Sequence, residues 1–406
     1  MPDGTSVVTL DDVTVNASPA APAATPRKQT DDTLSLVVDQ TEWIGWQRVN
    51  VTLSLEQVPS TFDIEVTEKY PTGATIDIKP GSPCQVKIGG DLVITGYIDR
   101  YSAAIAPTAH SVRITGRSKS EDLVDCAAFV GDKDNPSYQI TGGTTLSIIQ
   151  QLAKPYGVEV QSDAGPGSTV PLFNINLGET VWEIVDRLTK NSGLLAYDMP
   201  DGSVMLSQAG NSGSMGSGFA QGVNVESAEV AFTMDQRFSE YEGFQTSTLA
   251  FTKDSGGHTA RGVIATDEGV PRYRKRIIIA EQVQPDGAAI IEKRVQWEKN
   301  RRMGRSTAIT IVCDSWRDSG GKLWMPNYLA PIAVAALKVP NASWCIGNVT
   351  FTRNEQGQHA SVMLMPKEAF VPAPELFLPL PPLLGNLQTN NPTAPGPIAP
   401  GAAEVP

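Results

Sequence analysis

A chain of 406 residues is long enough for two to four domains at roughly 150 residues per domain. Its composition of 40% hydrophobic and 19% charged residues, with 36 glycines and 30 prolines, indicates a folded chain rich in strands and turns and excludes a disordered protein. Lys and Arg number 32 against 44 Asp and Glu, and the resulting net charge of -12 disfavours sequence-wide binding of nucleic acid, because both molecules would be anionic.

The sequence also predicts neither export nor membrane insertion. Apolar stretches such as 277–280 and 332–337 fall far short of the roughly 20 residues that span a bilayer. Asp3 stands where a secretory signal would carry Lys or Arg, so we expect the chain to stay where it is made. The four cysteines lie far apart without a CxxC pair, which predicts reduced core thiols rather than disulfides or a zinc site.

The chain begins with a segment that is poor in core-forming side chains. Residues 1–32 contain an Ala/Pro run and predict a flexible N-terminal arm, because proline removes amide donors. From residue 33 apolar side chains alternate, as in FDIEVTEK, where Phe62, Ile64 and Val66 share one face. Short alternating strands separated by turn formers predict a first β domain over 33–136, shaped as a small barrel or tube-like unit.

The apolar spacing then becomes helical in two related stretches, GTTLSIIQQLAKPYG and GETVWEIVDRLTKNSG. In the second stretch, the hydroxyl of Thr180 and the carboxylate of Glu183 have the spacing of a capping box. Each stretch leads into a strand-like run. The pattern predicts a small α+β region with two related helix units over 137–209.

Three further segments complete the predicted organisation. The Gly/Ser stretch 210–222 predicts a flexible linker. Alternating strands resume after it and, with a helix near 287–302, predict a second β-rich domain over 223–370. Dense proline in 371–406 predicts an extended tail with polyproline II character. The candidate partner anchors in this tail are Leu376, Phe377 and Leu378.

The first and last β regions share a weak internal repeat. LVITGYI, a loop and HSVRITG in the first region correspond to SWCIGNV, a loop and HASVMLM in the second. The aligned pairs are Gly96 with Gly347, Ile98 with Val349, Val112 with Val362, and Ile114 with Leu364. A glycine inside a strand costs entropy and packing, so its repeated placement predicts a bulge or a close backbone approach at both sites. Chance similarity between β-hairpins is the alternative interpretation.

No sequence motif for catalysis, nucleotide binding or metal binding occurs. The three histidines form no HExxH or Hx₃H pattern, and neither GxSxG nor GxxxxGK[ST] occurs. Glu179, Glu183 and Asp186 cluster at the start of the second helix, where acids complement the helix dipole rather than indicate a glycosidase pair. We therefore expect no catalytic residue, no cofactor and no metal ion.

A cationic stretch stands out in this acidic chain. Its members, taken as candidate interface residues, are Arg272, Arg274, Lys275 and Arg276. The helix that follows continues the positive charge, with Glu292 and Glu298 interspersed. This mixture favours a solvated helix face with local ion pairs, while a subunit interface and a DNA contact are the alternatives.

The run ITGYIDRYSAAIAPTAHSVRITGRSKSEDLVDCAA resembles the baseplate hub of Mu-like contractile-tailed phages. The resemblance continues in the same order through TLSIIQQLAKPYGVEV, LGETVWEIVDRLTKNSGLLAYDMPDGSVML, WMPNYLAP and VTFTRNEQGQHASVMLMPKEAF. It covers roughly residues 33–370. These motifs are structural rather than catalytic.

The resemblance implies a non-enzymatic structural protein of the virion, assembled in the host cytoplasm as a homotrimer. The implied fold class is α+β, mainly β, with two related small β-barrel or tube-like domains and an intervening α+β region, forming a ring. Such a ring would adapt a six-fold tail tube to a three-fold central spike. Its implied partners are the tail tube, central spike and baseplate wedge proteins, with DNA passing through without specific binding. The alternatives are the hub of a phage-like injection machine, such as a tailocin or secretion spike, and a tail-associated cell-wall hydrolase.

Overall fold

The computed structural model describes residues 32–67, 78–106, 109–246, 259–280 and 287–373. The N-terminal arm predicted over 1–32 and the proline-rich tail with Leu376, Phe377 and Leu378 therefore lie outside the described residues, apart from the ends of both segments. The described part is mainly β, as the sequence predicts.

The first β region consists of strands whose buried side chains alternate with exposed ones. Its elements are β1 (Leu34–Val38), β2 (Thr41–Trp43), β3 (Arg48–Ser54), β4 (Thr61–Thr67), β5 (Pro83–Ile88), β6 (Asp91–Ala106) and β7 (Ala109–Ser118). In β3, for example, Val49, Val51 and Leu53 are buried, while Arg48 and Asn50 are exposed.

The middle region contains two helices at the two related stretches. Its elements are α1 (Glu121–Asp125), β8 (Val130–Asp132), β9 (Asn135–Ser137), β10 (Gln139–Thr144), α2 (Thr145–Ala153), the 3₁₀ turn η2 (Lys154–Tyr156), β11 (Val160–Ser162), β12 (Thr169–Asn174), α3 (Val181–Ser192), β13 (Leu195–Asp198) and β14 (Val204–Ser207). The capping box expected at Thr180 is present, because Glu183 N donates to its hydroxyl at 3.2 Å and Thr180 N donates to the Glu183 carboxylate at 2.9 Å.

The last region contains the remaining strands and the longest helix. Its elements are β15 (Phe219–Ala220), β16 (Val225–Phe232), β17 (Glu240–Thr246), β18 (Thr259–Thr266), β19 (Lys275–Ala280), α4 (Gly287–Arg305), β20 (Thr307–Cys313), β21 (Leu329–Ala333), η3 (Ala335–Leu337), β22 (Ser343–Asn354), β23 (Gly357–Met365) and η4 (Lys367–Ala369). Helix α4 packs Ile291 and Val295 against Tyr241 and Ile278 of the small sheet β18-β17-β19.

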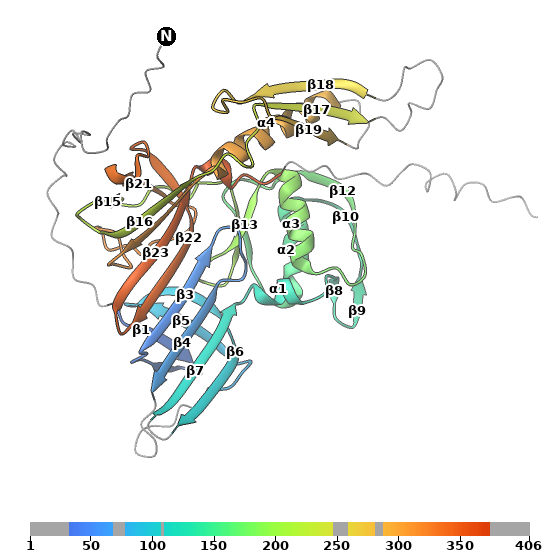
Figure 1. Ribbon diagram of the computed structural model, residues 1–406. Coiled ribbons are helices and arrows are strands. Elements are labelled where there is room, and N and C mark those ends of the chain that lie inside the picture. Colours follow the sequence, from blue (N-terminus) through green and yellow to red (C-terminus); the bar gives the residue numbers. More distant parts are fainter. Residues whose placement is uncertain (1–31, 68–77, 107–108, 247–258, 281–286, 374–406) are drawn as a thin grey trace, which may run out of the picture. The chain divides into compact units, whose positions relative to one another are not determined.

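One thirteen-stranded sheet runs through both β regions in the order β16-β20-β23-β22-β3-β4-β7-β6-β5-β1-β2, with β15 and β21 beside this path (Figure 1). The long strand β22 makes the connection. Its first residues pair with β21, and its residues from Asn348 to Arg353 pair with β3 on the same side. Within the described residues no pairing closes the sheet on itself, so the barrel form stays a prediction.

Each half of this sheet repeats one strand order, β3-β4-β7-β6-β5 and β16-β20-β23-β22-β21. The register repeats as well, because Val66 lies opposite Val112 in the first half and Ile311 lies opposite Val362 in the second. The aligned residues Val112 and Val362 therefore occupy equivalent positions. A common origin of the two halves stays a prediction.

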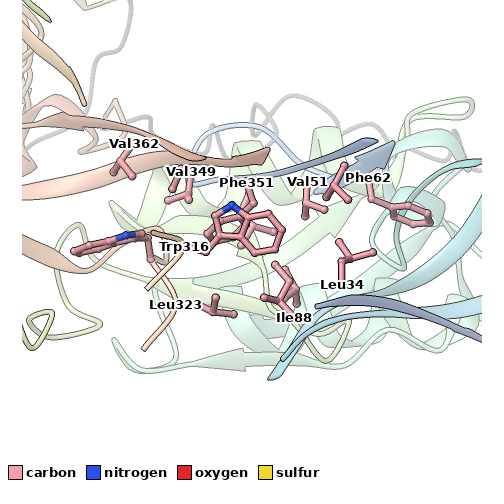
Figure 2. Close-up of a cluster of buried hydrophobic side chains, with 14 of the residues drawn as sticks. Leu34, Val51, Phe62, Ile88, Trp316, Leu323, Val349, Phe351 and Val362 are labelled. Carbon is pink, nitrogen blue, oxygen red and sulfur yellow. The ribbon is translucent and has the colours of Figure 1, made fainter. Parts of the chain in front are cut away.

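The two β regions share a hydrophobic core (Figure 2). Trp316, fully buried, contacts Phe351 edge to face with ring centroids 5.8 Å apart, and its indole N–H donates to His359 O at 2.9 Å. Figure 2 shows Leu34 and Ile88 of the first region in the same cluster. Separating the two β regions would expose this core to water, because each region supplies side chains to it.

The prediction of a flexible linker over the Gly/Ser stretch 210–222 is wrong, because this stretch is packed against the rest of the chain. Phe219 is buried and stacks on Trp324 with ring centroids 4.4 Å apart. Asp318 accepts a hydrogen bond from Gly216 N at 2.8 Å, and Asn327 accepts one from Gly210 N at 2.6 Å. Distant side chains therefore satisfy the backbone amides that composition alone would assign to solvent. The domain boundaries themselves stay predictions.

Candidate interaction surfaces

The two aligned glycines lie at close approaches of different kinds. A Cβ at Gly96 would lie 1.8 Å from the backbone oxygen of Arg117 on the neighbouring strand. Gly347 lies at a β-bulge in β22, where a Cβ would lie 2.4 Å from the ring of Phe370. Each glycine therefore lies at a close backbone approach or a bulge. The sequence alignment of these two strands is nevertheless wrong, because Val112 lies opposite Ala103 whereas Val362 lies opposite Val349. The register thus matches Val349 with Ala103 rather than Ile98, and Gly347 does not correspond to Gly96.

The cationic stretch is paired with acids and carbonyls. Arg274 donates to Met234 O at 2.9 Å and to Asp235 O at 2.7 Å. Lys275 contacts Glu242 and Glu240, and the hydrogen bonds that it donates to these carboxylates raise the pKa of Lys275 above its usual range. These contacts agree with the locally paired interpretation, while a role as an interface stays a prediction.

The sheet beside this stretch has an exposed apolar face. Helix α4 covers one face of β18-β17-β19. On the other face the exposed side chains are Ile264 at 40%, Ile277 at 53% and Ile279 at 61%. Three exposed isoleucines next to paired cations have the composition of a protein contact surface.

A second group of cations anchors α4 to the rest of the fold. The Trp297 indole and the Arg301 guanidinium both donate to Val371 O, at 2.8 and 2.6 Å. Arg301 and Arg305 both contact Glu56, two residues after the end of β3. Burial and the charge of Arg305 lower the pKa of Arg301. The basic hollow beside these residues has a volume of about 380 Å³.

Sequence reasoning missed a buried arginine that connects the two β regions. Arg317 donates from Nε to Asp32 at 2.6 Å, from Nη2 to Ile88 O at 2.8 Å and from Nη1 to Gly321 O at 2.9 Å. It also contacts Asp91. A planar guanidinium with five donors fits such a cluster of separate acceptors. No local signal in RDSGGK distinguishes it from a surface residue.

A second missed residue connects the middle region to the first. Asp198, at the end of β13, accepts hydrogen bonds from Ser60 N at 2.9 Å and Ser60 Oγ at 3.0 Å, and from Ser118 Oγ. Burial raises the pKa of Asp198, and the hydrogen bonds from Ser118 and Ser60 oppose that rise. The pocket beside it, of about 340 Å³, is also lined by Tyr197 and Leu323.

The acids at the start of α3 are occupied by structural contacts. Glu179 contacts Arg187 at 2.8 Å, Glu183 completes the capping box, and Asp186 contacts Lys190. In the part of the chain that the structure describes, no three His, Cys, Asp or Glu side chains gather as a metal site. Among its described helices, none has the length and hydropathy required to cross a bilayer.

Two strand edges of the large sheet have apolar side chains in solvent. On the side of β6 that faces away from β7, β5 pairs with β6 only as far as Tyr97. No described strand pairs with residues 102–106 on that side. The outer side of β16 has only a bridge between Gln221 and Val225 within the described residues. An edge strand of this kind is a template for pairing with another chain.

Three family models match the chain. The model for the N-terminal domain of Mu phage baseplate assembly protein GpP-like proteins matches residues 33–118. The model for the second domain of gp44-like baseplate hub proteins matches residues 120–208. The model for the fourth domain of Mu phage baseplate assembly protein GpP matches residues 287–373. The matches follow one another in the order of the chain.

Individual proteins are similar to the chain over most of its length. Baseplate hub protein gp44 of Escherichia phage Mu is 30% identical over 349 residues, covering 84% of the chain and 89% of the phage protein. The 43 kDa tail protein of prophage MuSo2 from Shewanella oneidensis superposes with a TM-score of 0.71 at 29% identity, covering 84% of the chain and 99% of that structure.

More distant solved structures share the fold alone. The tail protein from Neisseria meningitidis MC58 has a TM-score of 0.67 at 19% identity, covering 84% of the chain and 98% of that structure. The E. coli c3393 protein, a component of the type VI secretion system, has a TM-score of 0.53 at 10% identity, covering 85% of the chain and 80% of that structure.

Proposed function

The chain belongs to the baseplate hub proteins of Mu-like phages, and from this premise we propose that three copies form a ring that joins the tail tube to the central spike. As a member of that family it is a structural component of the phage tail baseplate. The ring, its symmetry and its direct partners are the proposed part.

The observation that carries the proposal is the repeated half-sheet within one chain. The orders β3-β4-β7-β6-β5 and β16-β20-β23-β22-β21 give each chain two similar β units joined through β22 and β3. Three copies would present six such units around an axis, which suits a six-fold tube on one face and a three-fold spike on the other. A heterologous contact that repeats under rotation closes into a ring of this kind.

The charges on the large sheet suit a passage for DNA without specific binding. Arg117 contacts Asp99 at 2.7 Å, Arg48 contacts Glu65 at 3.1 Å, and Arg113 contacts Asp63. Cations neutralised by neighbouring carboxylates release few counterions from DNA, so they add little affinity for its phosphates. The overall charge of -12 acts in the same direction.

The exposed isoleucine face of β18-β17-β19 is the proposed contact for baseplate wedge proteins. Lys275, Ile277 and Ile279 alternate along β19 and so share one face, where Lys275 contacts Glu242, the residue opposite Ile277. The surface therefore combines exposed apolar side chains with a paired charge. That combination is typical of protein interfaces.

The proposed role is mechanical rather than enzymatic, and the ring transmits force through its interfaces. The acids at the start of α3 have structural partners, as described above. Incubation of the purified protein with peptidoglycan should therefore leave the turbidity unchanged. A fall in turbidity would favour a cell-wall hydrolase instead.

The ring is tested by the mass of the purified protein in solution, together with averaged electron-microscope images along the symmetry axis. We expect particles of three times the chain mass of 43.4 kDa, with six similar lobes around a channel. A monomer at every concentration tested would contradict the proposal. A ring whose six lobes fall into two clearly unlike sets of three would also contradict it.

A further inference from the structure

The joint between the two halves of the sheet has a defined register inside one chain. On β22, Phe351 lies opposite Val51 of β3, and Val349 lies opposite Leu53. Phe351, Val51 and Val349 are fully buried, and Leu53 is 5% exposed. The joint therefore extends the core from one half of the sheet into the other.

The strand equivalent to β22 in the first half is β6, and its residues can be matched through the neighbouring strand. Val349 lies opposite Val362 on β23, and Ala103 lies opposite Val112 on β7. Since Val112 and Val362 are equivalent, Ala103 is equivalent to Val349. Two residues further along, Ile105 is equivalent to Phe351.

The strand equivalent to β3 in the second half is β16. Val49 lies opposite Ile64 on β4, and Val230 lies opposite Ile309 on β20. Ile64 and Ile309 are equivalent through their partners on β7 and β23. Val230 is therefore equivalent to Val49.

Two residues further along each strand, Phe232 is equivalent to Val51. Two residues beyond these, Met234 is equivalent to Leu53. The ladder continues past the end of β16, because Thr233 N donates to Ser306 O at 2.9 Å. Residues 231–234 thus offer an edge equivalent to the part of β3 that pairs with β22.

The residues at these equivalent positions are exposed in the single chain. Ile105 is 78% exposed, Phe232 is 60% exposed and Met234 is 45% exposed, although each has the place of a buried residue at the internal joint. They lie on the core face of the sheet, since Ala103 and Val230 are opposite the buried Val112 and Ile309. Isolated apolar residues in solvent are common, but two sets with a matching register are not explained by chance exposure.

We propose that residues 102–106 of one copy pair antiparallel with residues 231–234 of the next copy, with Ile105 opposite Phe232 and Ala103 opposite Met234. The proposal rests on the proposed ring and defines the contact that closes it. Each junction between copies then repeats the junction within a copy, so all six joints of the ring have one geometry. The pairing also covers both exposed edges of the sheet.

Cysteine cross-linking tests the pairing. In the variant Ile105→Cys with Phe232→Cys, oxidation should produce linked dimers and a closed covalent trimer on a denaturing gel, and reductant should return them to monomers. Directly opposite strand residues have Cβ atoms about 4.5–5.5 Å apart, close to the separation in a disulfide. Each single variant controls for the four native cysteines and should remain a monomer band.

The matched control is Ala104→Cys with Phe232→Cys, which places the two sulfur atoms on opposite faces of the sheet. This pair should not form linked trimers. The native mass of each sample is measured before oxidation, so that the ring and the pairing are judged separately. A trimer that does not cross-link through 105 and 232 would overturn the pairing and leave the ring intact.

Three further outcomes are decisive. A monomer at all concentrations would overturn both the ring and the pairing. A cross-linked monomer, in which both cysteines belong to one chain, would overturn the pairing between copies. Open chains of linked copies without a closed trimer would support the pairing and overturn the three-copy ring.

Charge variants give an independent test. Ile105→Asp or Phe232→Lys alone should raise the concentration at which the trimer dissociates by about tenfold or more, because each places a charge in a buried contact. The double variant Ile105→Asp with Phe232→Lys should recover part of the loss. The control is Leu177→Asp, since Leu177 is 79% exposed and lies outside both edges. Equal effects of the control and the edge variants would contradict the pairing.

Discussion

At the scale of single residues, the buried Arg317 has the largest structural consequence. Arg317→Ala removes the hydrogen-bond donors that reach Asp32, Ile88 O and Gly321 O. This variant is expected to lower the free energy of unfolding by about 3 kcal/mol. Urea unfolding followed by tryptophan fluorescence measures the change. The matched control is Arg113→Ala, whose guanidinium contacts Asp63 at the surface and whose loss should cost less than about 1 kcal/mol. Equal losses in the two variants would contradict the assignment.

Glu121 predicts a pH dependence of stability. Burial and the charge of Asp99 raise the pKa of Glu121 to about 7 from 4.5, and Arg117 opposes the rise. The folded chain therefore binds this proton more tightly than the unfolded chain, and the free energy of unfolding falls as the pH rises through that window. Glu121→Gln should therefore be more stable than the wild type by about 1 kcal/mol at pH 8, after allowance for the lost Arg117 contact.

The same gain should disappear at pH 5, where Glu121 of the folded wild type already holds its proton. Urea unfolding at the two pH values measures both differences. The control Glu65→Gln removes a surface partner of Arg48 and should change the free energy of unfolding by less than about 0.5 kcal/mol at either pH. A gain of equal size at pH 5 and pH 8 would rule out the titration of Glu121 as its cause.

Single residues also show where sequence reasoning works and where it stops. The close contacts at Gly96 and Gly347 were predictable, because a glycine inside an alternating strand conflicts with local preference and so indicates a tertiary cause. Their alignment with each other was wrong, because the sequence pattern does not carry the register of the neighbouring strands. Arg317 was not predictable, because its acidic partners Asp32 and Asp91 lie 285 and 226 residues away in the sequence. Side chains whose role depends on distant partners carry no local signal.

At the scale of elements, alternation predicted strands well, and composition misassigned one connection. The strands β3 and β7 follow the alternation of apolar residues, which reflects burial on one face. The stretch 210–222 has the composition of a linker, but its amides are held by Asp318 and Asn327. Composition reports conformational freedom only where nothing else binds the backbone.

The packed stretch gives a direct test. A Cβ at Gly218 would lie 1.9 Å from the backbone oxygen of Pro331, so Gly218→Ala is expected to lower the free energy of unfolding by about 2 kcal/mol. The control Ser214→Ala changes an exposed residue of the same stretch and should have an effect below about 0.5 kcal/mol. Thermal and urea unfolding measure both variants. If Gly218→Ala leaves the free energy of unfolding unchanged, the stretch is a flexible linker as the composition predicts.

At the scale of the whole molecule, the shared core predicts that the two β regions depend on each other for stability. Strand β3 pairs with β22, and Trp316 packs among side chains from both regions. A fragment of residues 32–209 would expose β3 and leave Leu34 and Ile88 without Trp316, so it should show no cooperative unfolding transition alone.

Mixing this fragment with residues 210–373 should restore a cooperative transition, because the β3–β22 pairing and the core form between the two pieces. Circular dichroism during urea titration, for each fragment and for the mixture, measures the effect. The control mixture carries Phe351→Ala in the second fragment, which removes a fully buried ring from the joint and should weaken the association by about 3 kcal/mol or more. A cooperative transition in the first fragment alone would mean that each β region has a sufficient core of its own, and the continuity of the sheet through β22 would then be a contact between two independent domains.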